Sequence, residues 1–183
     1  TLSAHKFGGS QGVGALVLGL CGVTPTLLHG GGQEKSARAG TENVAGIVGF
    51  GVAASMARAE LEGYIEVQEA LHARLREALT EVDELVFYGQ DVPRVANTTL
   101  LSLAGVSSET LLMALDLEGI AVSNGSACSS GKMEPSHVLK AMGASNKEAM
   151  GAIRISTGWA STQNDIDRFV DAWHKVISRM KGK

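Results

Sequence analysis

The sequence predicts an α/β protein made of two unequal parts. From about residue 86 onward, strand-like segments alternate with helical segments, which is the pattern of a sheet layered with helices. Before residue 44 only one or two strands can be assigned, too few for a parallel sheet covered on both faces. Between residues 59 and 63 the composition changes from glycine-rich and apolar to charged. We therefore predict that residues 1–62 are the tail of a larger domain and that residues 63–183 form a complete small α/β domain.

The composition is that of a globular chain with little attraction for polyanions. Of 183 residues, 44% are hydrophobic and 19% are charged, and the formal net charge is −3. Nucleic acid and anionic membrane are therefore not expected as partners, and no metal site is expected. The longest apolar run, residues 44–57, is interrupted by glycines and is short for a bilayer span. The two cysteines have unlike surroundings, which favours a reducing, cytoplasmic compartment over a disulfide framework.

The first part of the chain predicts a strand, a loop and a helix. Residues 3–18 are typical of a turn that enters a strand over 12–18, and residues 29–43 form a polar, glycine-rich loop of a kind that is often functional. A helix is predicted from residue 44, and its first half is apolar on most sides and should be buried. Its second half, to residue 79, is amphipathic, with Gln68 as the polar exception in the apolar stripe.

The second part alternates strands and helices. Strands are predicted over 86–88, 98–103, 120–123 and 152–156. Helix signals lie between them. They are a cap at Ser107 or Ser108 with Gly119 as the stop, Pro135 in the first turn of a helix over 138–142, and capping-box pairs Ser145/Glu148 and Thr162/Asp165. The last helix has an apolar stripe that places Trp173 in the core.

A lysine near the amino terminus is the first candidate for chemistry. It lies between a hydroxyl, an imidazole and two glycines, in the segment Ser3-Ala4-His5-Lys6-Phe7-Gly8-Gly9. A lysine amine reacts with carbonyl compounds, and Ser3 and His5 could hold a phosphate on such a partner. The alternative is a surface lysine beside a turn, because lysine flanked by glycine is common in loops.

A cysteine among small polar residues is the second candidate. The segment is Gly125-Ser126-Ala127-Cys128-Ser129-Ser130-Gly131, which gives the thiol no apolar neighbour to pack against. This setting favours a reactive thiol at Cys128 over a small core residue, although free cysteine is often buried. Cys21 lies in an apolar segment and is assigned to packing.

These stretches occur in the same order in a known family. The lysine segment, extended to Gly14, closely resembles the pyridoxal-phosphate lysine motif of NifS/IscS-type cysteine desulfurases. Three later segments resemble later motifs of that family. They are Arg38-Ala39-Gly40-Thr41-Glu42-Asn43, the Cys128 segment with Glu134-Pro135-Ser136-His137-Val138-Leu139, and Ile153-Arg154-Ile155-Ser156-Thr157-Gly158. The resemblance covers essentially the whole chain.

The resemblance implies a fold, a cofactor and residue roles. The fold would be the carboxy-terminal part of a fold-type I transferase dependent on pyridoxal 5'-phosphate (PLP), working as a homodimer. Lys6 would bond to PLP and move the Cα proton, with Ser3 and His5 at its phosphate. Thr41 would reach the phosphate of the neighbouring subunit, and Arg154 would hold the carboxylate of L-cysteine. Cys128 would take the substrate sulfur as a persulfide, leave L-alanine, and pass sulfur to an iron–sulfur scaffold or another acceptor.

The same resemblance implies that this chain is incomplete. In the family, roughly the first half of the chain precedes the lysine and supplies a histidine stacked on the ring, an acid at the pyridine nitrogen and a phosphate-binding turn. None of these can be assigned here, so the isolated chain is expected to be inactive without a missing amino-terminal half. Two alternatives remain: a non-catalytic module that binds a partner or carries sulfur on Cys128, and a selenocysteine lyase. Ser10 stands where the family often has proline.

Overall fold

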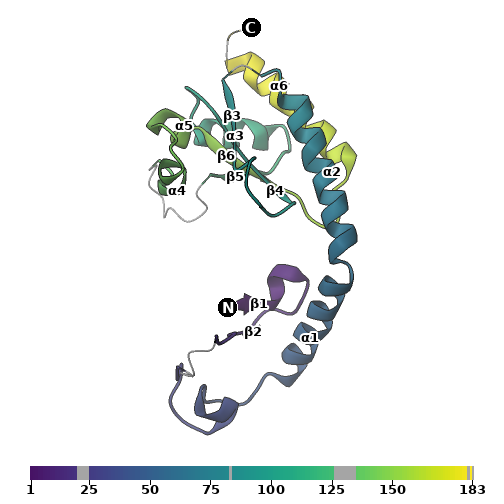
Figure 1. Cartoon of the computed structure of the whole chain (residues 1–183), viewed down its shortest axis with the longest axis vertical. Coiled ribbons are helices and arrows are strands. Elements are labelled where there is room, and N and C mark those ends of the chain that lie inside the picture. Colours follow the sequence, from purple (N-terminus) through teal and green to yellow (C-terminus); the bar gives the residue numbers. More distant parts are fainter. Residues whose placement is uncertain (20–24, 83, 126–134, 181, 183) are drawn as a thin grey trace. The chain divides into compact units, whose positions relative to one another are not determined.

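A computed structural model describes residues 1–19, 25–82, 84–125, 135–180 and 182. Contacts between residues divide the chain into two compact units, Thr1–Glu62 and Gly63–Lys183. The helices and strands of both units are labelled in Figure 1. The candidate Cys128 and the packing residue Cys21 lie outside the described residues.

The first unit begins with a short antiparallel hairpin. Strand β1 (Leu2–Ser3) pairs with β2 (Gly14–Ala15), and the 3₁₀ helix η1 (Ala4–Phe7) lies in the connection between them. The strand predicted over 12–18 is therefore wrong in length. Its apolar residues 16–18 are exposed, because β1 offers only two residues for pairing. The predicted loop contains a second 3₁₀ helix, η2 (Gln33–Ser36), and a parallel bridge between Leu28 and Arg38.

Helix α1 (Val44–Ala59) follows this loop. Asn43 caps it, because its side-chain oxygen accepts a hydrogen bond from the Gly46 nitrogen at 3.1 Å. The rings of Phe7 and Phe50 lie 5.4 Å apart between centroids and join η1 to the helix. The prediction that the first half of this helix is buried is wrong for its large apolar residues. Those that are exposed are Val44, Ile47, Val48, Val52 and Met56.

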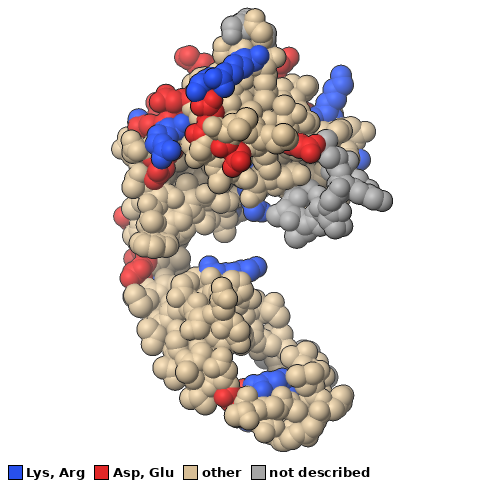
Figure 2. Space-filling view, turned by 180° about the vertical axis from the view of Figure 1, so that it is seen from behind, with Lys and Arg blue, Asp and Glu red and all other residues tan. Residues whose placement is uncertain are grey.

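The exposure of α1 follows from how little of the first unit covers it. Gly46 and Ala53 are buried, and the principal packing partner of α1 among the described elements is η1, a single short turn. In the view of Figure 2, the surface formed by residues 1–62 carries few charged side chains. The amino-acid sequence thus gives α1 an apolar surface that the described residues leave open to solvent.

The helical segment breaks where the composition changes. Helix α1 ends at Ala59, and α2 (Leu61–Leu79) begins two residues later, with Glu60 between them. Within the described ranges, no single helix is both long and apolar enough to cross a membrane, while α1 and α2 satisfy that test only as a bent pair, by length and composition.

The second unit is built on a four-stranded antiparallel sheet. Its strand order is β3 (Leu85–Tyr88), β4 (Thr98–Leu103), β6 (Ala152–Ser156) and β5 (Ser123–Asn124). The strands predicted over 86–88, 98–103 and 152–156 are confirmed. The strand predicted over 120–123 is misplaced, because Ile120 and Val122 pack against the core instead of pairing.

Helices cover both faces of this sheet. On one face, α2, α3 (Ser108–Leu117) and α6 (Gln163–Met180) pack on the alternate strand residues Leu101, Leu103, Ile153 and Ile155. On the other face, α4 (His137–Ala141) and α5 (Asn146–Met150) contribute to a smaller cluster with Ala152 and Leu100. Trp173 has no exposed surface, which confirms its assignment to the core.

Most helix starts agree with their sequence signals. Ser107 caps α3, and Ser145 with Glu148 forms the predicted capping box of α5. At the start of α6, the Thr162 nitrogen donates to the Asp165 carboxylate at 2.8 Å, and the Asp165 nitrogen donates to the Thr162 hydroxyl at 3.3 Å. The helix predicted over 138–142 is α4, but the placement of Pro135 in its first turn is wrong, because Ser136 is the cap and Pro135 lies before it.

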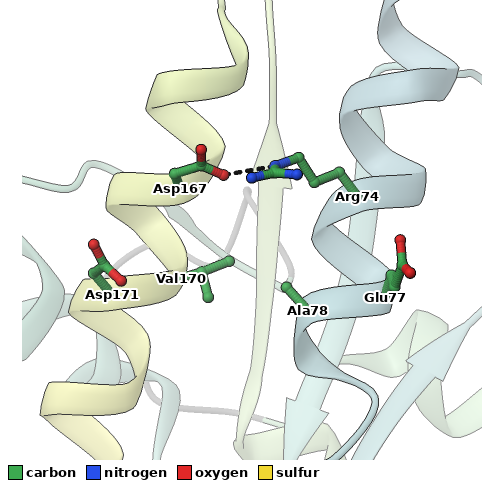
Figure 3. Close-up of a pocket in the computed structure, with 6 residues that line it drawn as sticks. All are labelled: Arg74, Glu77, Ala78, Asp167, Val170 and Asp171. Atoms are coloured by element: carbon green, nitrogen blue, oxygen red, sulfur yellow. Dashed lines mark hydrogen bonds and ion pairs between the residues drawn. The ribbon is translucent and has the colours of Figure 1, made fainter.

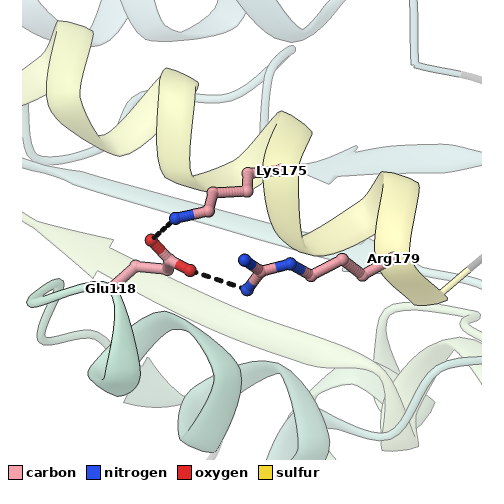
Figure 4. Close-up of polar contacts among 3 residues, drawn as sticks. All are labelled: Glu118, Lys175 and Arg179. Carbon is pink, nitrogen blue, oxygen red and sulfur yellow. Dashed lines mark hydrogen bonds and ion pairs between the residues drawn. The ribbon is translucent and has the colours of Figure 1, made fainter.

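Ion pairs join the last helix to its neighbours. The Glu118 carboxylate, at the end of α3, binds Lys175 Nζ at 2.5 Å and Arg179 Nη1 at 2.8 Å (Figure 4). The hydrogen bond from Lys175, followed by the charges of both cations, lowers the pKa of Glu118 below its ordinary range. These contacts stabilise the ionised carboxylate against α6.

Candidate functional site

The turn that carries Lys6, η1, is held in place by Ala4. Ala4 is fully buried, its nitrogen donates to the Val13 oxygen at 3.2 Å, and its oxygen accepts from the Gly9 nitrogen at 2.9 Å. Gly8 ends η1 with φ of 89°, a left-handed conformation that glycine adopts readily. The backbone of the turn is therefore fixed from inside, and the side chains of His5 and Lys6 are exposed.

The side chains on this turn suit an aldehyde that carries a phosphate. Among the contacts of the described residues, Lys6 has no hydrogen bond and no ion pair, so its amine is not engaged by a carboxylate. Ser3 supplies a hydroxyl and His5 an imidazole within three residues of it. An amine for the carbonyl and polar groups for the phosphate are the types of group that PLP needs.

Thr41 lies in the same unit, on the loop before α1. Its side chain is exposed, and it follows Gly40, whose φ is 96°. Arg38 holds this loop from within, because its Nη1 donates to the Gly40 oxygen at 2.7 Å and to the Ala39 oxygen at 3.2 Å. Arg38 also forms an ion pair with Glu34 at 3.7 Å. The loop thus presents a threonine hydroxyl without using it in its own hydrogen bonds.

Arg154 is placed in the middle of the sheet of the second unit. It lies on β6, paired with Leu100 of β4 on one side and Ser123 of β5 on the other. Its Nε is buried and has no hydrogen-bond partner among the described residues. Because buried guanidinium nitrogens are normally hydrogen-bonded, this atom is suited to a carboxylate that arrives with a substrate.

The chain enters the Cys128 segment beside the same strand. Gly125 donates its nitrogen to the Ala152 oxygen at 2.9 Å. A Cβ at Gly125 would lie 2.8 Å from the Cβ of Ala152, so only glycine fits without movement. Ser123, two residues earlier, is the partner of Arg154. The segment that contains Cys128 therefore begins next to the strand that carries Arg154.

The structure brings together three of the residues predicted for the site. Ser3, His5 and Lys6 share one turn, Thr41 lies on another segment of the same unit, and Arg154 belongs to the second unit. The roles assigned to these residues and to Cys128 stay predictions.

A buried polar network in the second unit was not predicted. Gln68 and His72 lie one turn apart on the buried face of α2, with at most 1% exposure, and reach Thr99 of β4 and Thr157 just beyond β6. Burial, and then the charges of Arg94 and Arg76, lower the pKa of His72 from 6.5 to about 4. The one available signal was the polar Gln68 in an apolar stripe.

A surface groove between α2 and α6 is unconnected with these residues. Its volume is about 400 Å³, and it is lined by Arg74, Glu77, Ala78, Asp167, Val170 and Asp171 (Figure 3). The Arg74 Nε donates to Asp167 at 2.6 Å across it, so its cation is already paired. Of the described residues predicted for the site, none lines this groove.

The family of the chain follows from a match over most of its length. Residues 1–169 match the model of the aminotransferase class-V family, and the chain belongs to that family. Proteins of this family are PLP enzymes. The α/β architecture is the one expected of this family.

Known relatives narrow the similarity to cysteine desulfurases. The chain is 41% identical over 182 residues to the cysteine desulfurase IscS of Dictyoglomus turgidum, and the match covers 99% of this chain and 46% of the relative. It is 39% identical over 181 residues to IscS of Methanosarcina thermophila, with 99% and 45% covered. A solved structure of a NifS-like protein matches with a TM-score of 0.83 and 34% identity, over 96% of this chain and 45% of that one. The chain thus spans about half the length of these relatives.

Proposed function

We propose that this chain is the carboxy-terminal part of a PLP-dependent cysteine desulfurase that acts in the cytoplasm as a homodimer. The observation that carries the proposal is the 41% identity to a cysteine desulfurase over 99% of the chain. The free amine of Lys6 and the unpartnered Nε of Arg154 supply the two groups that an amino-acid substrate and PLP need most.

The reaction transfers one sulfur atom. L-Cysteine and the thiol of Cys128 give L-alanine and a persulfide on Cys128. The C–S bond of the substrate breaks, an S–S bond forms, and Cβ of the product gains a proton. PLP, when bound, acts as an electron sink that makes the Cα proton acidic. The persulfide then gives its outer sulfur to an iron–sulfur scaffold or to another acceptor protein.

Six residues of the chain have roles in this proposal. Lys6 holds PLP and moves the Cα proton, Ser3 and His5 bind the phosphate, and Thr41 binds the phosphate in the neighbouring subunit. Arg154 binds the substrate carboxylate, because a planar guanidinium matches a carboxylate with two parallel hydrogen bonds. Cys128, as the thiolate, attacks the substrate sulfur, since the thiolate is the nucleophilic form.

The first experiment measures products with the protein at its native length. With L-cysteine and a thiol reductant, the protein should release alanine and sulfide in equal amounts. The Cys128→Ala variant should release no sulfide and should keep the yellow colour of bound PLP, whereas Lys6→Ala should lose the colour. Sulfide release at the normal rate by Cys128→Ala would contradict the persulfide. Selenide release from selenocysteine far above sulfide release would favour the lyase.

The second experiment concerns the 183-residue chain by itself. Mixed with PLP, it should give no stable yellow complex, because more than half of the length of the relative lies beyond the part that matches this chain. A stable coloured complex would contradict the proposal that the chain needs that portion.

A further inference from the structure

The buried network around His72 has a single consistent direction of hydrogen bonding. Thr157 has one hydroxyl proton, and this proton is donated to the Gln68 Oε1. The Thr157 oxygen must therefore accept the bond that joins it to His72 Nε2 at 2.8 Å. His72 then carries its proton on Nε2, and its Nδ1 accepts from the Thr99 hydroxyl at 2.6 Å.

The network ends on the backbone just beyond β6. Gln68 Nε2 donates to the Gly158 oxygen at 3.2 Å, and the Gly158 nitrogen donates to the Ser161 hydroxyl at 3.0 Å. The Thr157 nitrogen also donates to the Asn97 oxygen at 3.0 Å. The end of β6 is thus held by two side chains of α2 in addition to the sheet.

Arg154 depends on this segment for its place. It lies three residues before Thr157, and strand alternation puts its side chain on the sheet face opposite to His72. Among the described residues, no side chain binds its buried Nε. The position of its guanidinium is therefore set by the backbone of β6, and β6 is fixed at its carboxyl end by the network.

We propose that Gln68 and His72 are positioning residues, which fix the end of β6 through Thr157 so that Arg154 presents its guanidinium to the substrate carboxylate. This inference rests on the proposed function. It adds that a hydrogen-bond chain on one face of the sheet determines substrate affinity on the other face.

The test removes one hydroxyl from the native-length enzyme. Thr157→Val keeps the shape of the side chain and leaves His72 and Gln68 without their shared partner. We expect the KM for L-cysteine to rise about ten-fold, because small misplacements of a binding group are costly, while kcat stays within about two-fold and the PLP colour is retained. Thr157→Ser, which restores the hydroxyl, should return the KM to within about two-fold of the wild-type value.

A double-mutant cycle separates positioning from general destabilisation. Arg154→Ala should raise the KM, and adding Thr157→Val to it should cause no further rise, because both changes remove the same interaction. Ser107→Ala, which removes the cap of α3, is the control that destabilises the same unit and should leave the KM unchanged. If Thr157→Val does not fold, Gln68→Met takes its place with the same expectations.

Several results would overturn the inference. They are an unchanged KM in Thr157→Val, an equal rise of the KM in Ser107→Ala, or independent, multiplying effects of Thr157→Val and Arg154→Ala on the KM.

Nitrogen NMR of labelled histidine provides a readout independent of activity. It should find the His72 proton on Nε2, and a proton on Nδ1 would contradict the hydrogen-bond chain. A wild-type protein that forms no alanine from L-cysteine would defeat the proposed function itself, which is a separate result.

Discussion

The buried His72 should make the second unit lose stability as the pH falls below neutral. Its imidazole has no exposed surface, and its pKa is lowered from 6.5 to about 4. In the unfolded chain the imidazole takes up a proton as the pH falls through 6.5, whereas in the folded chain it stays neutral until the pH approaches 4. The unfolded state therefore binds more protons between these values, and the free energy of unfolding falls as the pH falls.

The size of this effect follows from the two pKa values. One pKa unit corresponds to about 1.4 kcal/mol, so lowering the pH from 7 to 5 should cost about 2 kcal/mol from His72 alone. Burial is the main cause of the shift, and Arg94 and Arg76 add to it by repelling a positive charge on the imidazole. The loss down to pH 5 occurs while most carboxylates are still ionised, and it continues as the pH approaches 4.

Urea unfolding of the 183-residue chain measures this loss. The two tryptophans, Trp159 and Trp173, both lie in the second unit, so their fluorescence reports on its unfolding. His72→Gln should remove about 2 kcal/mol of the difference between pH 7 and pH 5, whatever its effect at pH 7. His174→Gln, on the exposed face of α6, is the control and should keep the wild-type dependence. Parallel stability curves for the wild type and His72→Gln would refute the reasoning.

Three further outcomes can be checked by thermal or urea unfolding. Gly151→Ala should lower the free energy of unfolding by about 2 kcal/mol, because a Cβ there would meet the Leu103 carbonyl oxygen. Gly63→Ala, with open space around it, should raise the free energy of unfolding by about 0.5 kcal/mol. Equal effects of the two substitutions would contradict the packing at Gly151. Glu118→Gln should lower the melting temperature at low salt and have a smaller effect in 1 M salt, and an effect independent of salt would contradict its ion pairs. Arg154→Met should stabilise by about 1 kcal/mol while KM rises, and a loss of stability would show that its buried Nε has a partner.

Features decided by neighbouring residues could be predicted from the sequence. The capping box at Ser145 and Glu148 and the stripe that buries Trp173 depend on spacings of three and four residues, which a helix brings together by itself. The same holds for the turn that carries Lys6, where glycines mark the bends. These local rules fixed most helix positions in the second unit.

Features decided by distant residues could not be predicted. The apolar residues of α1 indicated burial, but burial needs a partner, and the described part of the first unit offers little beyond η1. The network of Gln68, His72, Thr99 and Thr157 joins residues up to 89 positions apart. Its members look unremarkable singly, because a threonine in a strand and a histidine in a helix have many uses.

Strand β6 is where the core and the proposed chemistry meet. Ile153 and Ile155 pack into the main core and Ala152 into the smaller one, so burial holds the backbone of the strand on both faces. Arg154 lies between these residues with an unpartnered Nε, which costs about 1–3 kcal/mol. A structural role would favour an apolar side chain there, because methionine would fill similar space without that cost. The arginine is explained if its partner arrives from outside the chain, as a substrate carboxylate does, and the surrounding apolar contacts offset its cost until then.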